Sequence, residues 1–210
     1  YTIKRQRAAE ASSLNYRGRS IMEVKKYIND HSKINLVFIP GGPGLSSISF
    51  EKLLPLKEKY NLFLLNPMGT TSEPSDFHSY DVLLSEVKQT IKDMDNVVLC
   101  GHSFGGIQAI DIAANNCQNI RGLIVIGAPV SSNAFASLGE RFGRGITDRH
   151  AEISGKLENQ PSDEIYKEWF YVYRKFYFHP DHADQCIATI TDDSVCVKSY
   201  TEAISESATK

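Results

Sequence analysis

Long hydrophobic segments are missing from this sequence of 210 residues. No apolar run approaches the roughly 20 residues that a membrane-spanning helix needs. The basic residues Lys4, Arg5 and Arg7 are not followed by an apolar segment, so a secretory signal peptide is not predicted either. We therefore expect no membrane partner and a cytoplasmic location. The first residue is Tyr1 rather than Met, which indicates a fragment or a processed form.

Sequence patterns for bound groups are also missing. The four cysteines include no C-x-x-C pair, a spacing typical of zinc sites, and no G-x-G-x-x-G follows a predicted strand as in dinucleotide-binding proteins. We expect no metal and no cofactor. Cys186 and Cys196 are ten residues apart and could form a disulfide, whereas isolated reduced thiols are the alternative that we favour.

An excess of charge of either sign is absent as well. The chain has 23 Lys and Arg against 25 Asp and Glu, a net charge of −2, and 41% of its residues are hydrophobic. This balance gives no electrostatic basis for binding nucleic acid or an anionic membrane. The chain is large enough to bury a hydrophobic core. Its partner is expected to be a small-molecule or peptide substrate, and the composition leaves the oligomeric state open.

The most informative residues that are present lie at positions 101–106, which read G-H-S-F-G-G and contain the pattern G-x-S-x-G. A short apolar run precedes them at residues 97–100, and apolar residues recur at three- and four-residue steps from Phe104 to Ala114. This order predicts a strand, a sharp turn and a helix, the surroundings of a nucleophile elbow. Ser103 is then the candidate nucleophile, with glycines nearby because the turn leaves no room for side chains.

A second glycine motif lies upstream of the first. Residues 35–39 have the composition of a strand and run into P-G-G-P-G at residues 40–44. A Gly-Gly pair after such a strand lets backbone N–H groups turn inward. We therefore expect an oxyanion hole made by the N–H of Phe104 and by the N–H of Gly41 or Gly42.

Strand-like and helix-like segments alternate along the first half of the chain. We expect strands at residues 34–39, 62–65, 97–100 and 121–127, and helices at residues 47–60, 80–94 and 104–114. The strand at residues 121–127 is expected to be buried, and an opening β-hairpin or two strands is expected within residues 14–28. The alternation predicts an α/β fold with a mostly parallel sheet, in which catalytic groups lie at the carboxyl ends of the strands.

The pattern changes after Pro129. Residues 131–210 contain no comparable strand-like run, so we predict a core over residues 1–130 and a helical region over residues 131–210, without a sheet strand between residues 131 and 162. Aromatic residues recur there at helical spacing. We interpret this stripe as a helix-packing face, which is compatible with substrate contact; its members are Tyr166, Trp169, Phe170, Tyr173, Phe176 and Tyr177.

The two glycine motifs resemble those of the α/β-hydrolase superfamily, and in particular of the proline iminopeptidase type. That group carries H-G-G-P-G in the oxyanion loop and G-H-S-W-G-G at the elbow, close to what this chain has at residues 40–44 and 101–106. A third landmark, D-x-R-G-x-G-x-S, falls at residues 66–73, where Gly69 is the clear match. The departures at Pro40 and Met68 weaken the aminopeptidase interpretation more than the fold.

The resemblance implies an α/β-hydrolase fold in which residues 131–210 form a helical cap over the active site. In this superfamily the acid and the histidine base follow the nucleophile on later strands, so the last core strands, the base and the acid are expected beyond residue 210. His150, His179 and His182 follow no predicted sheet strand, and we assign none of them as the base. Residues 179–182 are interpreted as a polar turn rather than as a metal-binding pair.

Functions of different classes are compatible with these residues. The first is a serine hydrolase that cleaves an N-terminal residue from a peptide or another acyl bond, with esterase, lipase-like and carbon–carbon bond hydrolase activities as alternatives. The second is a hydrolase fold that binds without catalysis; the intact elbow favours the first. An aminopeptidase also needs an acidic group for the substrate's amino group, and the helical region offers several unranked candidates: Glu140, Glu152, Asp163, Glu164 and Glu168.

Overall fold

A single, mostly parallel sheet organises the computed structural model, which describes residues 22–70, 79–115, 118–191 and 195–207. Within these ranges the strand order is β1-β3-β2-β4-β5. β1 is antiparallel to β3, and the other neighbours are parallel. The predicted α/β architecture is therefore confirmed. The strands are β1 (Glu23–Tyr27), β2 (Asn35–Ile39), β3 (Asn61–Asn66), β4 (Val97–His102) and β5 (Ile120–Ile126).

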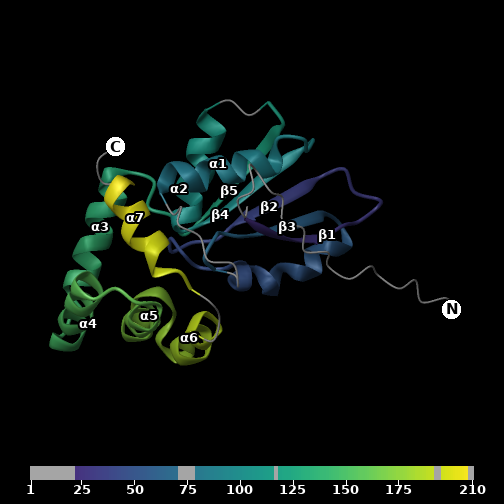
Figure 1. The fold of residues 1–210 in the computed structure, drawn as a ribbon. Coiled ribbons are helices and arrows are strands. Elements are labelled where there is room, and N and C mark those ends of the chain that lie inside the picture. Colours follow the sequence, from purple (N-terminus) through teal and green to yellow (C-terminus); the bar gives the residue numbers. More distant parts are fainter. Residues whose placement is uncertain (1–21, 71–78, 116–117, 192–194, 208–210) are drawn as a thin grey trace.

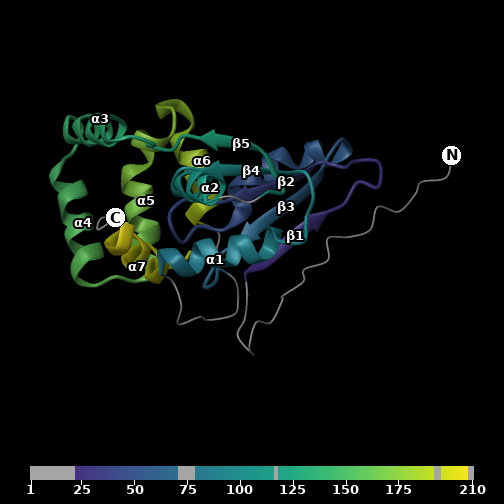
Figure 2. The same cartoon turned by 90° about the horizontal axis from the view of Figure 1, so that it is seen from above.

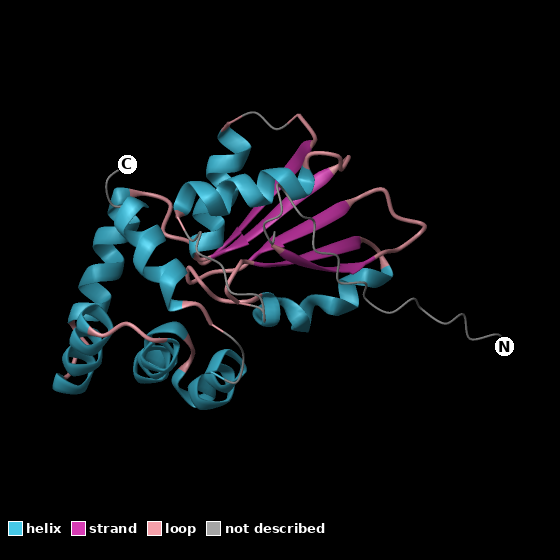
Figure 3. Cartoon of the chain, viewed as in Figure 1, coloured by secondary structure: helices cyan, strands magenta, loops and turns pink. Residues whose placement is uncertain are grey.

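Helices cover both faces of the sheet and lie beyond one of its ends (Figure 1). α1 (Tyr80–Ile91) and α2 (Phe104–Ala114) pack on one face, and the 3₁₀-helix η1 (Ser47–Glu58) packs on the other. Figures 2 and 3 show the later helices beyond the end to which β4 and β5 point. These helices are α3 (Ser132–Gly143), α4 (Asp148–Asn159), α5 (Asp163–Tyr177), η2 (Pro180–His182), α6 (Ala183–Thr191) and α7 (Val197–Ser207).

Alternate residues of the central strands are buried on opposite faces of the sheet, as the pleat of a strand requires. Ile39 of β2 and Leu99 of β4 lie in the core formed with α1 and α2. Phe38 of β2 and Cys100 of β4 lie in the core formed with η1. Because β2 and β4 are covered on both faces, their positions are fixed, and so are the loops that leave their carboxyl ends.

Three expected elements differ in type or extent from the observed ones, and the first of them is the helix expected at residues 80–94, which ends at Ile91 as α1. Residues 47–60, predicted as a helix, form the 3₁₀-helix η1, which ends at Glu58 and contains Pro55. Proline has no N–H to donate and its ring clashes with the carbonyl four residues earlier, so regular α-helical bonding does not continue through it. Within the predicted hairpin at residues 14–28, the described part forms β1, which pairs with β3; residues 14–21 lie outside the described residues.

The strand expected at residues 121–127 forms as β5, but the expectation that it is buried is wrong. β5 lies at the edge of the sheet beside β4, and no strand in the described ranges pairs with its other side. Its apolar side chains remain partly exposed: 40% for Leu123, 47% for Ile124, 36% for Val125 and 41% for Ile126. Strands of parallel sheets are normally buried on both faces, so this edge is unusual.

The region after β5 is helical, as predicted, and no described segment between residues 131 and 162 is a strand. The aromatic stripe of α5 is a packing face, because Tyr166, Phe170 and Tyr173 are buried. Its cluster also includes Tyr200 of α7, whose ring centroid lies 4.8 Å from that of Tyr166. None of the helices in the described ranges has the length and apolar composition needed to cross a membrane.

We expect the central and edge strands to respond differently to the same substitution. Leu99 of β4 is paired in register with Leu123 of β5, but Leu99 is fully buried and Leu123 is not. Leu99→Ala should lower the free energy of unfolding by about 2–5 kcal/mol through lost burial and a cavity. Leu123→Ala should lower it by about 1 kcal/mol or less. Urea unfolding of both variants checks this; equal losses would contradict the edge position of β5.

Candidate active site

Ser103 is the single residue between β4, which ends at His102, and α2, which begins at Phe104. Its backbone has φ 52° and ψ −122°, and such a conformation costs a residue other than glycine about 1–3 kcal/mol. Two hydrogen bonds of 2.8 Å hold it: the Ser103 N–H donates to the Ile126 carbonyl, and the Ser103 carbonyl accepts from the Gly106 N–H. The predicted strand, sharp turn and helix are confirmed.

The glycines around Ser103 are required by close backbone contacts. A Cβ atom on Gly105 would lie 2.3 Å from the Ile39 carbonyl oxygen and 2.4 Å from that of Pro40. A Cβ atom on Gly101 would lie 2.3 Å from the Gly105 carbonyl oxygen. The first turn of α2 therefore lies directly on the backbone of β2 and β4, which agrees with the steric reason inferred from the sequence.

The loop after β2 lies beside the elbow, because Ile39 is paired in register with Gly101. A Cβ atom on Gly41 would lie 3.0 Å from the Ser103 Cβ, so Gly41 lies directly against Ser103. Gly42 has φ 114°, a value that favours glycine. The Leu45 N–H donates to the Gly41 carbonyl over 3.3 Å and closes the loop.

Phe104 occupies the first position of α2 and is buried. The first N–H groups of a helix have no partner within the helix, and the helix dipole makes this end favourable for negative charge. Ser103, Phe104 and Gly41 are thus brought together, and Gly42 follows Gly41 directly. The start of a helix beside a serine is a place that favours a group with negative charge.

The third motif is only partly described, since residues 71–73 lie outside the described ranges. Gly69 has φ 80°. Asn66, buried at the end of β3, accepts a 2.8 Å hydrogen bond from the Ser47 N–H through Oδ1 and so fixes the start of η1. The sequence pattern did not reveal this role, because the partner lies on a different element.

No histidine in the described ranges forms a hydrogen bond with the Ser103 hydroxyl; His78 lies outside them. The ring of His102 packs edge-on against Phe50, with centroids 6.3 Å apart. Burial lowers the pKa of His102 below its usual value, which keeps the ring neutral. The ring of His102 thus packs beside the elbow, with Phe50 as its aromatic neighbour.

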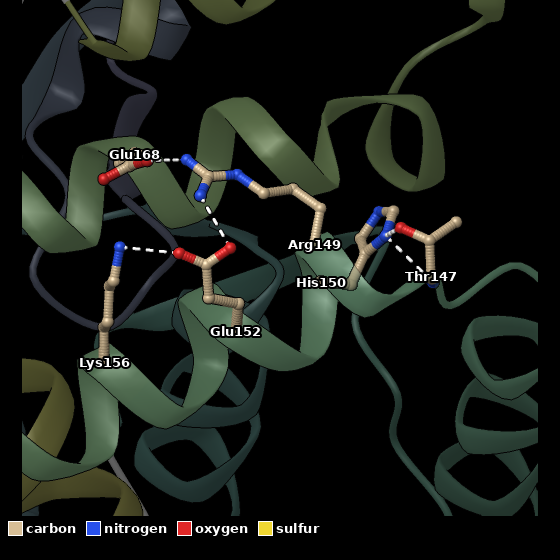
Figure 4. Close-up of polar contacts among 6 residues, drawn as sticks. All are labelled: Thr147, Arg149, His150, Glu152, Lys156 and Glu168. Atoms are coloured by element: carbon tan, nitrogen blue, oxygen red, sulfur yellow. Dashed lines mark hydrogen bonds and ion pairs between the residues drawn. The ribbon is translucent and has the colours of Figure 1, made fainter.

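The later histidines have local structural roles. His150 Nδ1 accepts a 3.2 Å hydrogen bond from the Thr147 N–H, which caps α4 (Figure 4). His179 lies just before η2, and its Nδ1 accepts a hydrogen bond from the Asp181 N–H over 3.4 Å. Residues 180–182 form the short 3₁₀-helix η2, with His179 as its N-cap. In the described ranges, no group of three His, Cys, Asp or Glu residues is placed to hold a metal ion.

The acidic candidates of the helical region are all engaged locally. Figure 4 shows Glu152 between Arg149 of its own helix, at 3.0 Å, and Lys156, at 2.8 Å, while Arg149 also pairs with Glu168 of α5. The Lys156 ammonium and the Arg149 guanidinium lower the pKa of Glu152. Glu140 pairs with Arg144, and Asp163 accepts a hydrogen bond from the Val197 N–H. Glu164 interacts with its own backbone N–H.

The described cysteines are free thiols, so Cys186 and Cys196 do not form the disulfide that was one of the alternatives. Cys100 is buried in β4, and burial raises the pKa of its thiol to about 12. It therefore remains protonated and unreactive at neutral pH.

A sharp strand–turn–helix at the carboxyl end of a central parallel strand defines an α/β-hydrolase fold. The chain matches the Alpha/beta hydrolase family over residues 36–195, more than half of its length, and belongs to this family. It is 34% identical over 113 residues to the proline iminopeptidase of Saccharolobus solfataricus, covering 48% of this chain and 35% of that protein.

Solved structures show the same fold. The structure of VinJ superposes with a TM-score of 0.65 at 20% identity, covering 93% of this chain and 71% of that one. The structure of the proline iminopeptidase of Mycobacterium smegmatis superposes with a TM-score of 0.58 at 14% identity, covering 91% of this chain and 69% of that one. The chain spans only 35–47% of the length of the curated relatives that it matches. The resemblance inferred from the two glycine motifs is confirmed.

We expect Gly105→Ala to destabilise the fold strongly. Its Cβ would meet two carbonyl oxygens within 2.4 Å, so either α2 or the end of β2 must move, at a cost of about 3 kcal/mol or more. Gly155→Ala in α4 is the matched control, since a Cβ there meets nothing within 4 Å. The control should be neutral or stabilising by up to about 1 kcal/mol. Thermal unfolding measures both, and a harmless Gly105→Ala would contradict the close approach.

Proposed function

We propose that this protein is a serine hydrolase in which Ser103 is the nucleophile. The observation that carries the proposal is the left-handed φ of 52° at Ser103, held between β4 and the first turn of α2. Strain of this kind persists where function needs it. The surrounding glycines, which admit no side chain, support the same interpretation.

The proposed reaction begins when Ser103 Oγ attacks the carbonyl carbon of the substrate and gives its proton to a base. The N–H of Phe104, with that of Gly41 or Gly42, binds the oxygen that becomes negative. The oxyanion then collapses, the base protonates the departing amine or alcohol, and an acyl group remains on Ser103. Water activated by the same base releases the acid and restores the serine.

The proposed substrate class is a peptide, from which an N-terminal residue is removed. The name of the Saccharolobus solfataricus relative and the motif at residues 40–44 support this choice. A second candidate is an ester. A peptide substrate would need an acidic side chain to bind its amino group, and the acidic candidates of α3, α4 and α5 are already engaged with other protein groups. An ester substrate has no such requirement, which favours the ester. The cytoplasmic location remains a prediction.

We further propose that the base and the acid lie beyond residue 210, on strands that would extend the sheet from β5. The support is the apolar edge of β5, which no described strand pairs. Residues 131–210 are proposed as the cap, since α3, α4 and α5 lie beyond the end of the sheet near which Ser103 stands (Figure 1). A cap at this place excludes water and selects the substrate.

Labelling with a fluorophosphonate probe tests the nucleophile and the position of the base together. The 210-residue chain should react slowly, because a positioned base contributes about 10²–10⁴-fold to such a step. A longer form of the protein that carries the proposed base and acid should react at least about 100-fold faster. Intact-mass and peptide analysis should place the label on Ser103.

Ser103→Ala is the control for this experiment and should abolish labelling in both forms. Rapid labelling of the 210-residue chain would show that a base lies within it, and variants of His179 and His182 would then identify it. A longer form that remains unlabelled would contradict the serine hydrolase and favour binding without catalysis.

The oxyanion loop gives a separate prediction. In Gly42→Ala, the new Cβ would lie 2.9 Å from the Gly44 nitrogen and 3.0 Å from that of Leu45, at a φ that alanine avoids. The loop must shift, and kcat for a p-nitrophenyl ester in the longer form should fall about 100-fold or more. Gly139→Ala, whose Cβ meets nothing within 4 Å, should retain full kcat. Unchanged kcat in Gly42→Ala would remove this loop from the oxyanion hole.

A further inference from the structure

One hydrogen bond joins the helical region to the loop that follows β2. The hydroxyl of Tyr166, on α5, donates to the carbonyl oxygen of Pro43 over 2.8 Å. The two residues are 123 positions apart in the sequence. Pro43 follows the Gly-Gly pair directly, so the bond acts on the loop that is proposed to bind the oxyanion.

The Tyr166 hydroxyl is held in one place. The side chain is only 1% exposed, and its ring lies 4.8 Å, between centroids, from those of Phe170 and Tyr200. Burial raises the pKa of Tyr166 well above its usual value, so the hydroxyl stays protonated and remains a donor. Its position is set by α5 and α7 rather than by the loop that it binds.

A second contact fixes the next carbonyl of the same loop. The Cys196 N–H donates to the Gly44 carbonyl over 2.8 Å. The Cys196 carbonyl oxygen occupies the space where a Gly44 side chain would begin, 2.1 Å from an ideal Cβ. Leu45 and Val195 form an isolated antiparallel bridge beside this contact. Two successive carbonyls, of Pro43 and Gly44, are therefore held by the region after β5.

The other side of the loop rests on the core, where the first turn of α2 contacts Ile39 and Pro40 through Gly105. The loop thus lies between a fixed core and a fixed α5. We propose that Tyr166 is a positioning residue, whose hydroxyl holds residues 40–45 in the conformation that places the Gly-Gly amides beside Ser103. The inference rests on the proposed function, since it concerns the oxyanion hole of that reaction.

The physical reason is the narrow range in which oxyanion donors work, about 2.7–3.1 Å from the oxygen that gains charge. A misplacement of about 1 Å costs about 100-fold in rate. Without the Tyr166 hydroxyl, the Pro43 carbonyl would lose its partner and the loop would be free to turn toward water. The ground-state contacts of the substrate in the cap would change little, so the effect should fall on kcat rather than on KM.

Tyr166→Phe tests the proposal, with Tyr173→Phe as the matched control. Tyr173 is buried on the same helix, stacks on Trp169, and its hydroxyl interacts with two groups of α4, Ser154 Oγ at 3.0 Å and the His150 carbonyl at 3.5 Å. Each variant removes one hydrogen-bonding hydroxyl from a buried tyrosine of α5, so losses of stability of the same order are expected. In the longer form, Tyr166→Phe should lower kcat for a p-nitrophenyl ester about 10- to 100-fold at nearly constant KM, whereas Tyr173→Phe should retain kcat.

A second readout does not depend on activity. Amide hydrogen exchange of Gly41, Gly42, Gly44 and Leu45, whose N–H bonds the Gly41 carbonyl, should be accelerated in Tyr166→Phe and unchanged in Tyr173→Phe. Unchanged exchange in Tyr166→Phe, or unchanged kcat in an active enzyme, would overturn the inference. Accelerated exchange in a protein whose wild type cleaves no ester or peptide would support the anchoring of the loop and refute the proposed hydrolase. Equal loss of kcat in both variants would reduce Tyr166 to a general structural role.

Discussion

The first turn of α2 lies against the ends of β2 and β4 with no side chain between them. The arrangement around Ser103 depends on this contact, because it brings the start of α2, the turn at Ser103 and the loop after β2 within a few ångströms of one another. Gly101 and Gly105 permit the approach, and the covered faces of β2 and β4 hold it rigid. The strain at Ser103 is sustained by this packing rather than by the turn alone.

The helical region also contacts the loop that follows β2. Through Tyr166 and Cys196 it binds carbonyls of the loop that adjoins the elbow, so the geometry beside Ser103 is determined by two parts of the chain that are distant in sequence. At the surface, an ion pair between Arg149 of α4 and Glu168 joins α4 to α5, the helix that carries Tyr166. Exposed pairs of this kind contribute little stability each, and the aromatic cluster carries the packing.

The features that could be predicted from the sequence are those encoded by neighbouring residues. The elbow at residues 101–106 and the loop at residues 40–44 are local patterns with steric causes, and the structure reproduces their geometry. The exposure of β5 could not be predicted from the sequence, because its run of apolar residues resembles that of a buried strand. The contact of Tyr166 with Pro43 was equally hidden, because a helical stripe of aromatic residues does not show which hydroxyl reaches a partner 123 positions away.

The edge formed by β5 has a consequence for the behaviour of the polypeptide in solution. Leu123 to Ile126 form an apolar run without a charge or a proline, and the backbone N–H and C=O groups along its outer side offer a template for another strand. Such edges promote sheet-to-sheet aggregation between molecules. At high concentration, self-association of these 210 residues through β5 is then expected before unfolding. Ile124 is the most exposed of the four, and Ile124→Lys would place a charge on this edge and counter such pairing.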